Sequence, residues 1–247
     1  MRRSLSQSAI GIYRSCPYAY KLHYVDRKQS VFWDPSILDV GSIAHDVLDI
    51  YYKNYYLMSG TPNDILVKTY NVLKEKWDMS YSVEQFKKIY ECLQNHATWE
   101  SGNITNKIGV KPLTEIKIES DGFFGIIDYV DLVNRRVIDW KTGKWPTLSY
   151  TYRMQAHVYK KLFEGKFGEE LTHFYFYFLH SGEFRTVKYD MPKQKEVGEA
   201  VETLKNSIND SLMSNDFPKK PRTKNGCKYC SYKLYCKFGD KNVQEEN

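Results

Sequence analysis

The fold is decided by residues 123–141, FFGIIDYVDLVNRRVIDWK, which read as two strands joined by a tight turn. In the second strand Asp139 and Lys141 stand two residues apart, so their side chains project from the same face. Asp128 follows the apolar run of the first strand, where an unpaired carboxylate is costly unless a cation or another partner compensates it. We therefore expect one site with two carboxylates and an ammonium group, suited to a divalent cation and a phosphate.

Hydrophobic periodicity places further elements on both sides of this stretch. The helical period predicts helices at residues 7–13, 39–57, 63–79, 83–100, 149–163 and 193–213. Strand patterns lie at residues 113–119, 123–133, 136–141, 171–179 and 183–189, and tight turns make the first three an antiparallel meander. This order predicts an α/β core whose mixed central sheet is flanked by helices, with an early helical insertion.

The length of 247 residues and the apolar content of 42% fit one folded domain, 1–247. We divide it into an N-terminal segment, a helical region, a core and a C-terminal segment, at residues 1–38, 39–112, 113–213 and 214–247. No apolar stretch approaches the roughly 20 residues of a membrane-spanning helix, so we expect a soluble, cytoplasmic protein without a membrane partner. The start up to Lys21 lacks acidic residues, as mitochondrial transit peptides do, but Cys16 and its flanking aromatics favour a structural segment.

Positive charge gathers near the C-terminal end. The whole chain has a formal net charge of +6, while the stretch between Phe217 and Phe238 holds seven Lys and Arg residues and no acid. Such a stretch can follow a phosphate backbone, and its interleaved tyrosines can stack on unpaired bases. The candidate DNA contacts are Lys219, Lys220, Arg222 and Lys224, together with Tyr152 and Arg153 nearer the core strands.

Five cysteines, an odd number, and the lack of a secretory signal argue against a disulfide framework. One cysteine near the N-terminus and three near the C-terminus offer four thiolates to a metal site. They are Cys16, Cys227, Cys230 and Cys236. Four thiolates suit structural zinc or a [4Fe–4S] cluster, and spacing alone favours zinc in most proteins. Cys92 has no partner at ligand spacing, and we interpret it as a small core residue.

Four motifs in order make this sequence resemble the PD-(D/E)XK nuclease superfamily, and within it the RecB-like exonucleases. A Gly-x-x-x-His motif lies at residues 41–45, GSIAH, and a Gly-x-x-Asp motif at residues 125–128, GIID. They are followed by the acid-x-Lys core at residues 139–141, DWK, and by a Gln-x-x-x-Tyr motif at residues 155–159, QAHVY. Each motif alone is weak, whereas four in this order, on the expected element types, are specific.

The resemblance implies hydrolysis of a phosphodiester with Mg²⁺ or Mn²⁺. The implied metal ligands are His45, Asp128, Asp139 and the backbone carbonyl of Trp140. Lys141 would orient the attacking water and stabilise charge on the phosphate, while Gln155 and Tyr159 would position the DNA strand. Without the resemblance, His45 would read as a satisfied core histidine and Tyr159 as a core residue. The number of catalytic metals, one or two, stays open.

The cysteine pattern is similar to that of RecB-like nucleases with an iron–sulfur cluster, such as the AddB nuclease domain and the CRISPR-associated single-domain exonucleases. The first ligand, Cys16, opens the stretch CPYAYK at residues 16–21, and the other three form a C-terminal Cys-x-x-Cys-x-x-x-x-x-Cys. The resemblance implies a [4Fe–4S] cluster that joins the two ends of the chain, with zinc as the alternative.

Together these implications describe a metal-dependent deoxyribonuclease, a stand-alone exonuclease on single-stranded DNA with 5′→3′ polarity. No GxxxxGK[ST] loop is present, so a separate helicase, or a CRISPR adaptation protein, could act as a partner. CRISPR adaptation and phage or host recombination and repair fit equally well. The alternatives are a structure-specific endonuclease, an RNA-directed enzyme, and an iron–sulfur or zinc module that binds nucleic acid without cleaving it.

Overall fold

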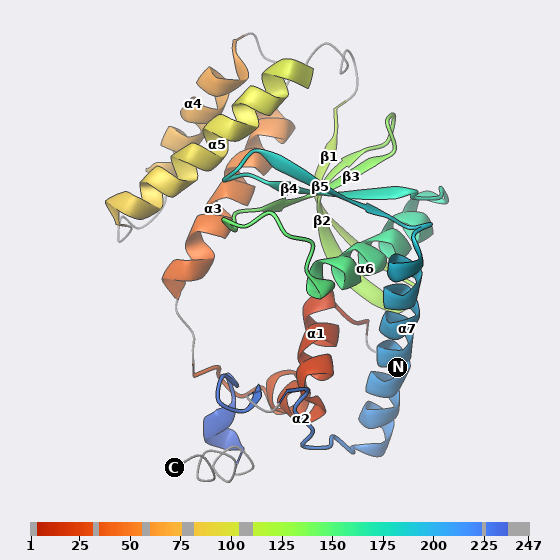
Figure 1. Cartoon of the computed structure of the whole chain (residues 1–247). Helices are drawn as coiled ribbons and strands as arrows, with labels where there is room; N and C mark the ends of the chain where they lie inside the picture. Colours follow the sequence, from red (N-terminus) through yellow and green to blue (C-terminus); the bar gives the residue numbers. More distant parts are fainter. Residues whose placement is uncertain are drawn as a thin grey trace.

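A five-stranded mixed sheet lies at the centre of the molecule (Figure 1). The computed structural model describes residues 4–31, 35–55, 60–75, 82–103, 111–223 and 226–236. Its strands are β1 (Leu113–Ser120), β2 (Phe123–Asp131), β3 (Arg136–Lys141), β4 (His173–Phe178) and β5 (Glu183–Lys188), and they lie in the order β1-β2-β3-β4-β5. The β3 and β4 strands are parallel, and the other neighbouring pairs are antiparallel. The predicted mixed sheet and its antiparallel meander are confirmed.

The turn between β1 and β2 fixes the register of the meander. Asp121 and Gly122 have φ angles of 51° and 73°, the left-handed values that a two-residue type I′ hairpin loop requires and that an Asp-Gly pair adopts readily. Pairing runs outward from Ser120 opposite Phe123 without an inserted residue. Because the turn sets the register, it also sets which side chains of β1 face those of β2.

Helices precede and follow the strands in the predicted order. They are α1 (Gln7–Ser15), α2 (Pro17–Tyr20), the π-helix η1 (Lys21–Val25), α3 (Pro35–Ile50), the π-helix η2 (Tyr51–Tyr55), α4 (Pro62–Lys74), α5 (Val83–Asn103), α6 (Tyr150–Phe167), α7 (Pro192–Ser214) and the short 3₁₀-helix η5 (Lys233–Tyr235). Of the helices predicted at 39–57 and 63–79, residues 56–57 and 76–79 lie outside the described part of the chain. None of the described helices combines the length and the apolarity needed to cross a bilayer.

The sheet separates two hydrophobic cores (Figure 1). The face covered by α1, α6 and α7 carries Phe123, Ile127, Phe174, Phe176 and Phe178. The opposite face, covered by α3, η2, α4 and α5, carries Tyr129, Ile138, Trp140, Tyr177 and Leu179. Alternation along β3 and β4 thus gives each face its own apolar side chains, as expected for strands buried on both sides.

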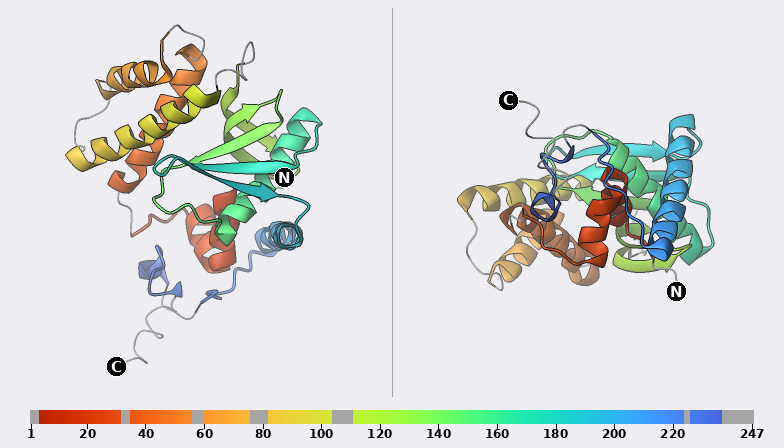
Figure 2. Two further views of the ribbon diagram at one scale, coloured as in Figure 1. Left: turned by 45° about the horizontal axis from the view of Figure 1, so that its top comes forward. Right: turned by 90° about the horizontal axis from the view of Figure 1, so that it is seen from below.

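Segments from opposite ends of the sequence are neighbours in space. The Arg222 N–H donates to the Ser15 carbonyl, and the Val31 N–H donates to the Ser231 carbonyl, both at 2.9 Å. Figures 1 and 2 show the blue segment that contains η5 beside α1 and α2. These contacts bring the predicted N-terminal and C-terminal cysteines into one region.

Candidate active site

The strands β2 and β3 separate at the predicted carboxylates. The pair farthest from the turn that joins the two strands is Tyr129 with Ile138. Asp128 and Asp139 are the next residues along each strand, just beyond the end of the paired ladder. Asp128 is buried, and its Oδ2 accepts a hydrogen bond from the Trp140 backbone N–H at 2.8 Å. The carboxylate thus accepts a backbone hydrogen bond that a neighbouring strand would otherwise accept from β3. This contact fixes Asp128 at the point where the two strands diverge.

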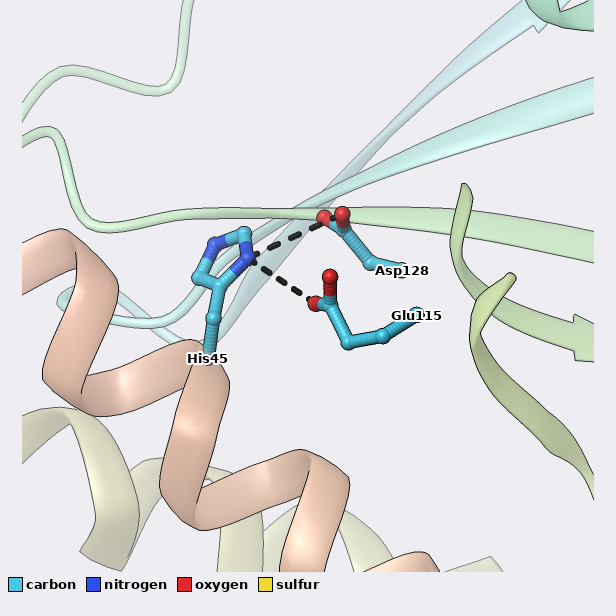
Figure 3. A group of neighbouring side chains, drawn as sticks. All are labelled: His45, Glu115 and Asp128. Atoms are coloured by element: carbon cyan, nitrogen blue, oxygen red, sulfur yellow. Dashed lines mark ion pairs between the residues drawn. The ribbon is translucent and has the colours of Figure 1, made fainter. Parts of the chain in front are cut away.

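His45 reaches the same point from α3. Its Nε2 lies 3.1 Å from the Trp140 carbonyl oxygen, at hydrogen-bond distance. Its Nδ1 lies 3.7 Å from Asp128 Oδ1 and 3.5 Å from Glu115 Oε1. In Figure 3 the imidazole and the two carboxylates point toward one another, from a helix and two strands. The ligand atoms of these three side chains all lie within 4.8 Å of one another.

Glu115 was missed by the sequence analysis. It lies in β1 between the pairs Thr114 to Tyr129 and Ile116 to Ile127, and its φ of 47° is left-handed, which is uncommon for a residue other than glycine. This backbone conformation directs the Glu115 carboxylate toward His45. A signal was available, because counting outward from the Asp-Gly turn places residue 115 opposite residue 128.

Asp139, Lys141 and Gln155 form a closed group beside this one. Lys141 Nζ lies 2.6 Å from Asp139 Oδ2 and donates to Gln155 Oε1 at 3.0 Å. Gln155 Nε2 donates to Asp139 Oδ1 at 2.6 Å. The Gln155 amide on α6 thus contacts both the carboxylate and the ammonium group of β3, and it fixes the orientation of each. Asp139 and Gln155 are buried, while part of Lys141 is exposed.

Two motif glycines allow this close assembly. A Cβ at Gly125 would lie 2.8 Å from Leu162 Cδ1 and 3.1 Å from Tyr159 Cε1, so only glycine lets α6 approach β2 this closely. A Cβ at Gly41 would lie 3.4 Å from Thr142 Oγ1, where α3 passes the chain that follows β3. Tyr159 therefore packs against the Gly-x-x-Asp strand from the helix that also carries Gln155.

The site holds an excess of negative charge, and this shifts the pKa values of its members. Burial, followed by the charge of Asp139, raises the pKa of Asp128 to about 8. Burial alone would lower the pKa of His45, but nearby carboxylates, Asp128 foremost, outweigh it and raise that pKa to about 9. Burial likewise opposes the charge of Lys141, yet the Asp139 carboxylate raises its pKa. Lys141 is therefore an ammonium donor and not a base.

A sequence model of the PD-(D/E)XK nuclease superfamily matches residues 4–237. The chain belongs to this superfamily. No curated protein matches the chain. Among solved structures, the crystal structure of SSO0001 is similar at 15% identity, covering 80% of this chain and 84% of that chain with a TM-score of 0.34, a value too low to define the fold. Membership of the PD-(D/E)XK nuclease superfamily implies metal-dependent nuclease activity.

The donor set fits the cations that PD-(D/E)XK nucleases use, Mg²⁺ or Mn²⁺. His45, Glu115 and Asp128 supply one imidazole and two carboxylates at mutual ligand distance, a combination that suits these ions. A cation bound here would withdraw charge from a phosphate and promote ionisation of a water molecule. Of the predicted ligands, His45 and Asp128 belong to this group, and the Trp140 carbonyl adjoins it. Asp139 instead turns its oxygens to Gln155 and Lys141.

The structure puts two predicted DNA-contacting residues at the start of α6. The ring centroid of Tyr152 lies 5.0 Å from Lys141 Nζ, so this tyrosine adjoins the group formed by Asp139, Lys141 and Gln155. Arg153 is half-buried, and its carbonyl accepts a hydrogen bond from Gln194 at the start of α7. Of the two, Tyr152 is the residue closer to the candidate site.

The predicted basic contacts of the C-terminal segment lie elsewhere. Lys219 and Arg222 line a cavity of about 660 Å³ between this segment and α1 and α2, and Lys219 Nζ lies 4.8 Å from the Tyr18 ring centroid. Lys220 is exposed. Lys224 lies outside the described residues. Of the four predicted basic contacts, Lys219 and Arg222 thus line this cavity.

The same cavity is lined by all four predicted ligand cysteines, Cys16, Cys227, Cys230 and Cys236. Burial, followed by the charges of the other three, raises the pKa of the Cys227 thiol. Among the described residues, no three of these sulfurs lie within 4.8 Å of one another, whereas zinc with bonds of about 2.3 Å would hold thiolates about 3.8 Å apart. Cys92 is buried in the core beneath α3 and α5, as predicted.

Proposed function

We propose that this PD-(D/E)XK nuclease is a Mg²⁺- or Mn²⁺-dependent DNA exonuclease of the RecB-like type. The convergence of four elements supports this: His45 from α3, Asp128 and Asp139 from the diverging strands β2 and β3, and Gln155 from α6. His45, Glu115 and Asp128 would hold the cation, with the Trp140 carbonyl adjoining it. Asp139 would serve either as a further ligand once its contacts rearrange or as the partner that orients Lys141.

In this proposal Lys141 supplies the positive charge that faces the scissile phosphate. It is held by Asp139 and Gln155 at 2.6 and 3.0 Å, and a preorganised ammonium stabilises the charge that develops on a phosphate without reorganising. Gln155 orients both groups, while Tyr159 packs α6 against β2. These contacts explain why the four motifs fall on four different elements, α3, β2, β3 and α6.

Single-stranded DNA is the proposed substrate, and the loop after β3 supports this choice. Trp145 is 74% exposed there, an unusual position for the largest apolar side chain, and Lys144 lies beside its ring. Arg185 Nε donates to the Pro146 carbonyl at 2.7 Å, which anchors the loop. An exposed indole next to a lysine can stack on an unpaired base while the cation follows the backbone.

We further propose that the four cysteines hold a [4Fe–4S] cluster, with zinc as the alternative. The shared cavity supports a cofactor in common, and four thiolates are the number that a [4Fe–4S] cluster takes. Such a cluster would join α1 and α2 to the C-terminal segment. Free thiols of this kind belong in a reducing compartment, which fits the cytoplasm of a prokaryotic or phage-infected cell.

The polarity 5′→3′ and the setting, either CRISPR adaptation or phage or host recombination and repair, come from the motif resemblance. A helicase or a CRISPR adaptation protein would be the partner in these settings.

The proposal is tested with end-labelled single strands. Linear and circular DNA, and linear RNA, are incubated with the anaerobically purified protein and Mn²⁺. An exonuclease shortens linear DNA progressively from the 5′ end and leaves circles intact. Cleavage of circles would favour the endonuclease alternative, and RNA degradation the RNA-directed one. Binding without cleavage of any substrate would sink the proposal and leave the binding module.

A further inference from the structure

One tyrosine ring holds two arginines from opposite ends of the chain. Arg14 Cζ lies 3.8 Å from the centroid of the Tyr150 ring, and Arg222 Cζ lies 5.8 Å from the same centroid. Arg14 belongs to the last turn of α1, Tyr150 is the first residue of α6, and Arg222 belongs to the C-terminal segment. The Arg222 N–H donates to the Ser15 carbonyl at 2.9 Å, which holds this arginine beside the end of α1.

The two guanidinium groups repel each other, and among the described residues no carboxylate forms an ion pair with either of them. Burial and then the charge of Arg222 lower the pKa of Arg14. Within the described ranges, the arginines that pair with a carboxylate are Arg135 and Arg185, and the first turn of α6 carries no acidic residue. Arg222 is exposed, and Arg14 and Tyr150 are half-buried. This is uncompensated positive charge at an accessible position, so an anion would relieve the repulsion.

The position of this cluster relates it to the candidate active site. Tyr150 precedes Gln155 by five residues on α6, which corresponds to about 7.5 Å along the helix axis. The ring centroid of Tyr152, in the same first turn, lies 5.0 Å from Lys141 Nζ. A strand whose scissile phosphate faces Lys141 would therefore pass the arginine pair within a few nucleotides. The macrodipole of α6 adds positive potential at the same end.

We propose that Arg14, Arg222 and Tyr150 form an arginine clamp that binds a backbone phosphate of the DNA strand away from the scissile bond and positions the strand across the start of α6. This inference rests on the proposed nuclease function. Planar guanidinium groups present paired N–H donors that match phosphate oxygens. Stacking on Tyr150 orients both groups while leaving those donors available. The clamp residues are positioning residues, since they do not touch the reacting atoms.

Binding of oligothymidylate to the full, anaerobically purified protein tests the clamp, with Ca²⁺ in place of Mn²⁺ to prevent cleavage. The neutral variant is Arg14→Gln/Arg222→Gln, and Arg14→Lys/Arg222→Lys keeps the charge. The matched control, Arg135→Gln/Lys188→Gln, removes two charges at the end of the sheet where β3 begins, away from Lys141. We expect the slope of log affinity against log salt to fall by about 0.7 in the neutral variant, the value for one lost phosphate contact on a single strand. The control should keep its slope, and the lysine variant should recover most of it.

A set of strands in which one phosphate at a time is replaced by an uncharged methylphosphonate locates the contact. One position outside the scissile phosphate should weaken binding to the wild-type protein and have no effect on the neutral variant. With Mn²⁺, KM should rise in that variant and kcat should change much less. Should the double variant fail to fold, Arg222→Gln alone, at an exposed position, carries the same test with a smaller change in slope.

Three outcomes overturn the clamp. The first is a neutral variant that keeps the wild-type slope and the wild-type response to methylphosphonates while the protein cleaves DNA. In that case the three residues only join α1 to α6 and to the C-terminal segment, and the nuclease function stands. If the lysine variant loses as much affinity as the neutral one, charge is not what the site supplies. Failure of the wild-type protein to bind or cleave DNA would overturn the clamp together with the proposed function.

Discussion

The carboxylate of Asp128 accepts a hydrogen bond from the backbone N–H of Trp140 at 2.8 Å. A side chain of β2 thus completes the backbone hydrogen bonding of β3 where the two strands separate. The carbonyl of the same Trp140 faces His45. One peptide segment therefore links the helix that supplies the imidazole to the strand that supplies the buried carboxylate, and the position of Trp140 in its core controls both.

Loss of Asp139 or Lys141 should abolish cleavage without unfolding the protein. In Asp139→Asn and Lys141→Ala, we expect cleavage to fall by at least about 100-fold, as when a preorganised charge-stabilising donor is removed. Cleavage of labelled single strands with Mn²⁺ measures the effect, and thermal unfolding monitors the fold. The control Lys188→Ala changes an exposed lysine at the end of the sheet away from Lys141. Near wild-type cleavage by either site variant would remove this group from the reaction.

Glu115 should be a cation ligand. In Glu115→Gln, we expect the affinity for Mn²⁺ to fall by about 10- to 100-fold or more, because one of two nearby carboxylates loses its charge. Substitutions of residues that support a metal site commonly have an effect of this size. Titration with Mn²⁺ measures this, and the exposed Glu196→Gln on α7 is the charge-matched control. If affinity is unchanged while the pKa of His45 falls, Glu115 serves only as an ion-pair partner of the imidazole.

Cation binding should strengthen as pH rises. The pKa values of His45 and Asp128 are raised to about 9 and about 8, so this pair holds at least one proton at neutral pH without a cation. A metal ligand must be deprotonated, so protons compete with the cation and are released when it binds. We expect Mn²⁺ affinity to increase by about tenfold per pH unit for each proton released between about pH 6.5 and pH 8. Calorimetry in two buffers of different ionisation enthalpy counts these protons, and a pH-independent affinity would contradict the assignment.

Gly125→Ala should separate α6 from β2. The added Cβ would meet Leu162 at 2.8 Å and Tyr159 at 3.1 Å, and overpacking of this kind lowers the free energy of unfolding by about 1–3 kcal/mol. Cleavage should fall as well, because α6 carries Gln155. Gly102→Ala is the control, since no atom lies within 4 Å of its added Cβ and alanine favours the helix. Equal stability of the two variants would show that α6 is not held this closely.

Iron should be bound by the anaerobically purified protein. We expect about four irons per chain and broad visible absorption, as for a thiolate-bound [4Fe–4S] cluster. Cys227→Ser should lose iron and have a lower melting temperature. Cys92→Ser should retain iron, because this thiol is buried in the core beneath α3 and α5, and the cavity is lined by the other four cysteines. One zinc per chain in place of iron would establish the alternative.

The sequence by itself determined the strands, their meander and most of the site. Asp121-Gly122 specified the hairpin, and the two-residue spacing of Asp139 and Lys141 placed them on one face. These properties depend on turn chemistry and on side-chain alternation, which act between near neighbours. The close pairing of His45 with Asp128 came from motif order and not from local patterns.

Only the tertiary structure decided which polar groups meet. It set the left-handed backbone that directs Glu115 to His45, the turn of Asp139 toward Gln155, and the meeting of Arg14 and Arg222 on Tyr150. These side chains come from elements far apart in the sequence. Their distances depend on how closely helices approach the sheet, and this is fixed by core packing, as at Gly125. Local sequence patterns do not predict such distances, because packing across the sheet brings together residues that are far apart in the sequence, whereas the patterns relate only near neighbours.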